Sequence, residues 1–110
     1  MTQVKGMRVR FGLSPSPDVQ GYAMYMEEEA LVLSYESERH DLTGKYTEEG
    51  EFGVFEMTDL PGMTTKDGIY NLGIVAIDDA GNESSMSIAE GVVLDFVAPD
   101  PPGVVIVERC

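Results

Sequence analysis

The chain has 110 residues, of which 43% are hydrophobic, so its length and composition fit one folded domain rather than a disordered segment. Its formal net charge of −13, from 20 acidic and 7 basic residues, disfavours binding to nucleic-acid phosphates and to anionic membrane surfaces. The longest apolar runs, Gly73–Ile77 and Val104–Val107, fall far short of the ~20 residues of a membrane-spanning helix, so no membrane insertion is expected.

The single cysteine is Cys110, so no intrachain disulfide is possible and the fold must be held by its core. An exposed thiol is expected there, able to form disulfides between chains in air. The first residues lack the apolar stretch and the small-residue cleavage site of a signal peptide. The localisation stays open between the cytoplasm, a virion and a larger exported protein.

Alternation of apolar and polar residues predicts three strands in the first third of the chain. In Met7–Leu13, apolar residues alternate with two arginines whose side chains would point to solvent. The prolines of Ser14–Asp18 end this strand because proline cannot donate to a sheet ladder. The second and third predicted strands are Gly21–Met26 and Ala30–Tyr35.

The middle of the chain is more polar and carries weaker patterns. Glu36–Gly50 is expected to be a long loop, or to hold a short edge strand near Lys45–Thr47. A further strand is predicted at Phe52–Leu60, and the Pro-Gly pair of Leu60–Met63 predicts a turn after it.

The strand predicted at Ile69–Ile77 carries the clearest pattern. Apolar residues recur on one face at every second position, and a polar turn then stops the strand because Asp and Asn bond their own backbone and Gly tolerates positive φ. The closing strand is predicted at Ser85–Phe96, where Gly91 would allow a bulge. The face residues are Tyr70, Leu72, Ile74 and Ala76, and the turn residues are Asp78, Asp79, Gly81 and Asn82.

Four segments in order resemble the pattern of a fibronectin type III domain. Val9–Pro17 resembles its second strand with the trailing Ser-Pro turn, and Gly21–Tyr25 resembles its third strand, usually Gly-Tyr-x-Val-Tyr. Leu60–Gly62 resembles the turn ahead of the family's corner tyrosine, here Tyr70, and Tyr70–Ser84 resembles its last hairpin.

The resemblance covers residues 8–96 and implies an all-β fold, an immunoglobulin-like or fibronectin type III-like β-sandwich of about seven strands. The family's core tryptophan has no counterpart, because the chain contains no Trp and Leu13 stands in its place. Phe11, Phe55 and the flexible methionine side chains are expected to fill that space.

The expected organisation is one β-sandwich, residues 1–97, followed within residues 98–110 by a Pro-rich linker and a short strand. Only six residues precede the first predicted strand, and they lack the family's first-strand entry, which Ala98–Glu108 resembles instead. An unpaired Val104–Val107 would be an exposed apolar edge. It therefore fills the empty first-strand position of its own chain, fills that of a neighbouring copy, or begins a further repeat.

The resemblance also indicates where binding would occur, since this family often uses the loops at one end of the sandwich. By position these are Ser14–Gln20 and Asp78–Ser84, and Glu36–Gly50 is a third candidate surface. The candidate binding residues are Asp18, Gln20, Asp78, Asp79, Asn82 and Glu83.

Other chemistries have simpler interpretations. The oxygen-bearing turn at residues 78–83 suggests calcium ligands, but its spacing is not that of an EF-hand, so an ordinary hairpin turn is favoured. The glutamates of Glu27–Glu29 and Glu48–Glu51 suggest a second cation site but are interpreted as solvated loop faces. His40 has no nucleophile motif beside it and is interpreted as a surface histidine. No metal, cofactor or catalytic residue is predicted.

The resemblance implies a non-catalytic structural or interaction module, a spacer or protein-binding domain of a larger bacterial or phage assembly. Its partner would be another protein, or a second copy through the C-terminal strand. The alternative is an accessory carbohydrate-binding module of a polysaccharide-active protein, with a glycan as partner. Outward-facing Tyr25, Tyr35 and Tyr46 on one sheet would favour the alternative, whereas cross-strand packing of these rings is the simpler interpretation.

Overall fold

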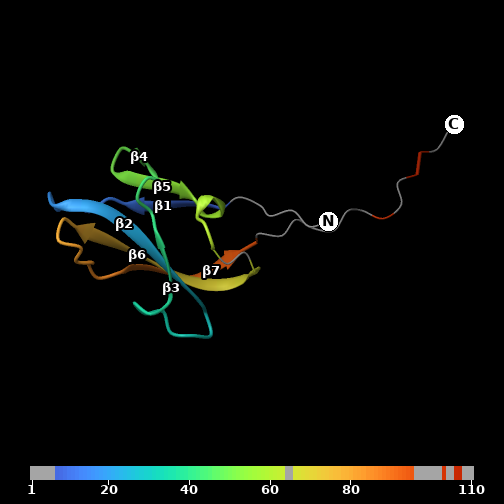
Figure 1. The fold of residues 1–110 in the computed structure, drawn as a ribbon. Helices are drawn as coiled ribbons and strands as arrows, with labels where there is room; N and C mark the ends of the chain where they lie inside the picture. The colour runs from blue at the N-terminus through green and yellow to red at the C-terminus, as the bar shows by residue number, and fades with distance from the viewer. Residues whose placement is uncertain (1–6, 64–65, 96–102, 104–105, 108–110) are drawn as a thin grey trace.

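The computed structural model describes residues 7–63, 66–95, 103 and 106–107. These residues form an all-β structure of two antiparallel sheets, ordered β1-β5-β4 and β3-β2-β6-β7 (Figure 1). The strands are β1 (Arg8–Gly12), β2 (Val19–Glu28), β3 (Glu38–Asp41), β4 (Thr47–Glu49), β5 (Phe52–Glu56), β6 (Gly68–Asp78) and β7 (Ser87–Leu94), and the short 3-10 helix η1 (Met57–Asp59) follows β5.

One short connection decides which edges of the two sheets share a side. β3 and β4 are edge strands of different sheets, and residues 42–46 join them directly. These two strands therefore lie on one side of the sandwich, which we call the closed side. β1 and β7 are the other two edge strands, and they lie on the opposite side, which we call the open side.

The main core between the sheets is rich in aromatic and sulfur-containing side chains. The Phe11 ring lies 4.9 Å from the Tyr22 ring and 6.0 Å from the Phe55 ring, measured between centroids. Phe11 and Phe55 therefore pack in this core together with methionine side chains. The methionines of this cluster are Met24, Met26, Met57 and Met63.

The clearest sequence pattern is confirmed by β6. Tyr70 and Leu72 are buried in the main core, and Ile74 and Ala76 are partly buried against it, so all four expected residues share the inner face. The period of two therefore placed this strand correctly.

A second, smaller cluster lies on the outer face of the four-stranded sheet. Ala23, Tyr25 and Val75 are 0 to 2% exposed there, although no second sheet covers them. The connections after β2 and β6 cover them instead, through Leu33 and Met86. Two loops of the chain therefore act as a partial third layer.

The other strand predictions had mixed outcomes. The strands expected at residues 7–13, 21–26 and 85–96 are confirmed by β1, β2 and β7. The strand expected at Ala30–Tyr35 is wrong, because this segment forms the turns of the connection that covers the outer face. The missing edge strand is β3, inside the segment expected to be a loop, and β4 begins at Thr47, where a short strand was considered.

Glycines mark the irregular points of the sheets. Gly91 adopts φ +66° in β7, where the pairing with β6 shifts by one residue, so the expected bulge is confirmed. The Asn71 side-chain oxygen accepts the Gly91 N–H at 3.0 Å and compensates for the interrupted ladder. Gly62, at φ +73°, forms the expected turn after Leu60.

Several predictions concern the end of the chain. Most of the linker, Val104, Val105 and Cys110 lie outside the described residues. Ile106 and Val107 are described, belong to no strand, and are 73% and 89% exposed. Across the described part of the chain, no helix has the length and apolar character needed to cross a membrane.

Candidate functional site

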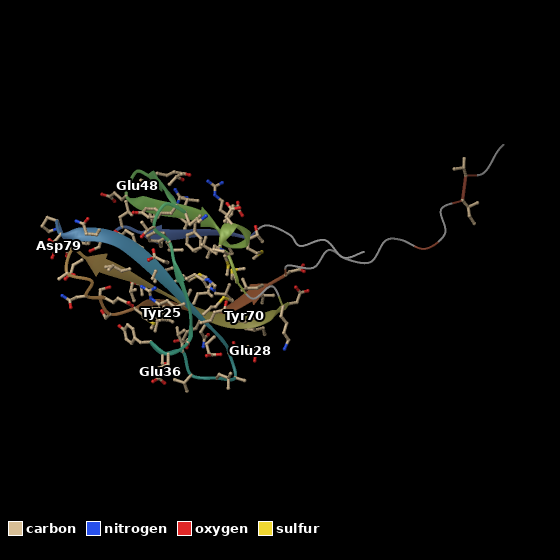
Figure 2. All side chains as sticks on the ribbon, in the orientation of Figure 1. Tyr25, Glu28, Glu36, Glu48, Tyr70 and Asp79 are labelled. Carbon is tan, nitrogen blue, oxygen red and sulfur yellow. The ribbon has the colours of Figure 1, made fainter. Side chains whose placement is uncertain are left out.

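The two loops expected at one end of the sandwich do come together there. They line a cavity of about 250 Å³, and most of its lining residues carry hydroxyl, carboxylate or amide side chains. Asp18, Asp78, Asn82 and Glu83 of the candidate residues lie in this wall, which we call the loop cleft. Gln20 lies in β2, and Asp79 lies in the turn after β6 (Figure 2). Both are exposed and lie outside the loop cleft.

Asp78 holds its own turn together. Its Oδ1 accepts the backbone N–H groups of Ala80 and Asn82 at 2.9 and 2.8 Å, and its Oδ2 accepts the Asn82 side-chain amide at 3.1 Å. These bonds, first of all those from Asn82, lower the pKa of Asp78 below its ordinary value. Asp78 and Asn82 therefore form the hairpin turn that was favoured over a calcium site.

Glu83 is also engaged within the chain. Its Oε1 accepts a short hydrogen bond from the Tyr25 hydroxyl, and its Oε2 lies 3.2 Å from Arg39 Nη2. The Arg39 guanidinium in turn lies 5.9 Å from the Tyr25 ring centroid. Burial, and then the bond to Glu83, raises the pKa of Tyr25. The three side chains tie the loop after β6 to strands β2 and β3.

Backbone N–H groups on both sides of the cleft also bond to side chains of the chain itself. The Tyr22 hydroxyl accepts the Ser14 N–H at 2.8 Å, and Ser84 Oγ accepts the Ala76 N–H at 2.9 Å. Of the candidate carboxylates in the cleft, only Asp18 makes no bond to another described residue. The loop cleft is therefore mainly a structural junction, with one exposed carboxylate available to a ligand.

A larger and more apolar cavity, of about 370 Å³, adjoins the loop cleft on the open side. It lies between the end of β1 and the facing parts of β6 and β7, and Phe11, Leu13 and Ile74 contribute its apolar wall. Hydroxyl groups also line it. They belong to Ser14, Ser84, Ser85 and Ser87.

His40 corrects an expectation. It was interpreted as a surface histidine, but it lies in β3 opposite Met24, faces the main core, and is 9% exposed. Its Nε2 lies 2.7 Å from Glu38 Oε2. The error arose because the segment was expected to be a loop, and strand pairing turns its alternate residues inward.

The three tyrosines do not form an exposed platform. Tyr25 is 2% exposed on the outer face, and Tyr35 packs edge-on against it at 5.5 Å. Tyr46 packs instead against Tyr22 and Phe11 of the main core, at 5.5 and 5.7 Å. These rings pack against other aromatic side chains, as the simpler interpretation required, but not as cross-strand pairs, because Tyr35 and Tyr46 lie in connections between strands.

The acidic clusters are spread over both sheets. Figure 2 shows Glu28 and Glu48 well apart, on the four-stranded and three-stranded sheets respectively. Glu28 pairs with Lys66 at 3.3 Å and Glu49 with Arg8 at 3.0 Å, both at the surface. Within the part of the chain that the structure describes, no three His, Cys, Asp or Glu side chains gather as a metal-ligand set.

Sequence reasoning missed a set of exposed apolar residues on and beside the four-stranded sheet. Ile69 and Val93 pair directly across β6 and β7 on the outer face and are 46% and 68% exposed. Ile88 shares this face of β7, and Leu31 and Val32 belong to the connection that begins beside Ile69. We call these five residues the outer apolar surface. The alternation in Ser85–Phe96 indicated that this strand has two faces, but it did not indicate which face stays exposed.

Comparisons with protein-family models, with curated proteins and with solved structures find no match to this chain.

Proposed function

We propose that this protein is a non-catalytic interaction module built on a fibronectin type III-like sandwich. The strand order supports this fold. If β1 corresponds to the second strand of an immunoglobulin-like domain, β1-β5-β4 and β3-β2-β6-β7 reproduce the order of its two sheets without the first strand.

Tyr70 gives independent support. It lies near the start of β6, and its hydroxyl donates to the Lys66 carbonyl at 2.7 Å, four residues earlier. A tyrosine at this corner that bonds back to the preceding backbone is a hallmark of immunoglobulin-like sandwiches. Burial raises the pKa of this hydroxyl, which keeps it protonated as a donor.

The outer apolar surface is the observation that carries the functional proposal. Five large aliphatic side chains, each between 46% and 85% exposed, belong to one face of the sheet and the loop beside it. Exposed apolar clusters with a polar rim are typical of protein-binding sites. The loop cleft is a weaker candidate because its carboxylates mostly bond the chain itself.

The charges around this surface indicate the partner's character. Glu28 ends β2 beside it, Glu29 follows and donates its N–H to the Ile69 carbonyl, and Glu90 lies in β7 between Ile88 and Val93. With a net charge of −13, the domain favours a partner that surrounds an apolar centre with Lys or Arg. We therefore propose a basic protein surface as the partner.

The test replaces Ile69 and Val93 together by Ser in the full chain. Wild-type and variant proteins are immobilised and exposed to an extract of the source cells, and bound proteins are quantified by mass spectrometry. The matched control is Phe52→Ser, an exposed hydrophobic on the other sheet. We expect specific proteins to be lost with the double variant and kept with the control. Identical bound sets would contradict the proposal.

The carbohydrate-binding alternative is separated by the same proteins. The structure offers it no exposed tyrosine platform, since Tyr25 and Tyr46 pack into clusters. Binding of polysaccharides by the wild-type chain in calorimetric titrations, unchanged in the Ile69 and Val93 double variant, would favour it over the proposed module.

A further inference from the structure

The open side of the sandwich is incompletely covered. On the inner face of β7, Ser87 and Ala89 are exposed and Val92 is only partly buried. Leu13, which follows β1, and Ile74 in β6 are also partly buried and line the 370 Å³ cavity. Apolar side chains of the core thus border an unfilled space between the two edge strands.

The backbone of β1 also offers bonds toward that space. The Leu13 N–H donates to Glu51 at 2.9 Å, and the Met7 carbonyl accepts from Met57 at 2.7 Å, so the odd-numbered residues bond toward β5. In an antiparallel pair, the alternate residues direct their N–H and C=O groups to the other side. Arg8, Arg10 and Gly12 therefore present a strand edge to the open side, where β1 has no partner among the described residues.

The chain contains a segment suited to such an edge. Residues 103–107 read Gly-Val-Val-Ile-Val, a short and strongly β-branched run. Ile106 and Val107 lie in no strand and are 73% and 89% exposed, so within a single chain these side chains stay in water. The sequence of this segment, with its β-branched apolar side chains, is thus complementary to the unfilled space beside β1.

The direction of the chain decides which copy supplies the strand. β7 ends at Leu94, opposite Gly68, at the end of the sandwich where β1 begins (Figure 1). Every strand pair described is antiparallel, and an antiparallel partner of β1 must enter from the opposite end, at Gly12. To reach Gly12, the C-terminal segment of the same chain would first have to run back along the whole of β1. The C-terminal segment of another copy can enter at Gly12 directly.

We infer that residues 103–107 of one copy add to the open edge of β1 in a second copy. The added strand pairs with Arg8, Arg10 and Gly12 and places alternate side chains over the cavity beside Leu13 and Ile74. This inference rests on the proposed interaction module and names one of its partners, a second copy of this chain. It uses a different surface from the outer apolar surface, so either can fail alone.

The test measures the mass of the full chain by size-exclusion chromatography with light scattering, under reducing conditions and over a 100-fold range of concentration. We expect dimers or larger species to grow with concentration. Replacing Ile106 and Val107 together by Asp is expected to raise the concentration of half-association at least tenfold, because charges cannot enter the slot.

A second pair of variants tests the acceptor edge. Arg10→Pro removes an N–H on the open side and leaves the β5 ladder intact, so it is expected to weaken association like the Asp variant. Arg10→Ala is the matched control, since it also loses the Arg10–Phe52 ring contact of 4.6 Å but keeps the N–H. It is expected to associate like wild type.

A wild-type chain that stays monomeric throughout would overturn the inference. Association that survives both the Asp and the Pro variants would overturn it as well. The Ile69 and Val93 double variant is expected to associate normally. If it alone loses self-association, the copies meet through the outer apolar surface, which contradicts strand addition and leaves the proposed function standing.

Discussion

Each side of this sandwich has two edge strands, but the two sides differ in how completely the core between the sheets is covered. On the closed side, residues 42–46 cross from β3 to β4, and His40 in β3 and Leu42 in this connection are 9% and 0% exposed. On the open side, Leu13 and Val92 stay partly buried. The short connection between β3 and β4 covers the core on the closed side, whereas no strand of the described residues covers it on the open side.

The largest expected difference between the sides comes from truncating one leucine on each. Leu42→Ala removes a fully buried side chain and should lower the free energy of unfolding by about 2–5 kcal/mol. Leu13→Ala should cost only about 1 kcal/mol, because this side chain is only partly buried. Urea denaturation of both variants at a concentration where the protein is monomeric makes the comparison, and equal losses would remove the distinction.

Gly53→Ala tests how tightly the main core is packed around the Phe11 ring, between the open and closed sides. A Cβ at this position would lie 2.7 and 2.9 Å from two carbons of the Phe11 ring, so the ring must move. We expect a loss of about 1–3 kcal/mol by thermal or urea unfolding. Gly12→Ala, in the neighbouring strand with no atom near its Cβ position, is the control. A Gly53→Ala protein as stable as this control would show that the core is loose.

Tyr25→Phe tests how much the hydrogen bond between Tyr25 and the loop after β6 stabilises the outer face, in comparison with the closed side. Losing the bond to Glu83 should cost about 1 kcal/mol at pH 7. Because the folded pKa of Tyr25 is raised by burial, the bond's contribution is complete below pH 10 and is lost as the pH rises through the folded pKa. Denaturation at pH 7 and pH 11 should show the difference from wild type shrinking at the higher pH.

Asp41→Asn produces the smallest expected effect and acts on the closed side alone. The Asp41 carboxylate accepts bonds from the Thr43 side chain and N–H, the latter at 2.8 Å, and these bonds lower its pKa. Its contribution, about 0.5 kcal/mol, is therefore present above the ordinary value of 3.8 and lost as the pH falls through the folded pKa. Wild type and variant should differ in urea at pH 7 and converge near pH 2; a constant difference would exclude the charge as its cause.

The sequence predicted strands best where one face of the strand is buried and the other face is exposed. β6 is such a strand, and its face from Tyr70 to Ala76 was predicted correctly. β3 was missed because Glu38–Asp41 contains four polar or charged residues, and the only inward signal is the partly polar His40. Strand pairing with β2, a long-range effect, decides its structure.

The candidate site was predicted less completely. The sequence placed the two loops at one end, but it could not show that Asp78 and Glu83 would bond to Asn82, Tyr25 and Arg39, since these contacts depend on the packed structure. An empty first-strand position was predicted from the family resemblance, and it stays a prediction. The cavity on the open side and the direction of the free β1 groups required the strand register.

The most direct test of the open side is amide hydrogen exchange along β1, measured by NMR at two protein concentrations. The amides of Val9, Phe11 and Leu13 bond toward β5 and should be protected at both. The amides of Arg8, Arg10 and Gly12 should exchange fast in dilute solution and become protected as the concentration rises. Fast exchange of these three amides at every concentration, or equal protection at both, would contradict completion of this side by a second copy.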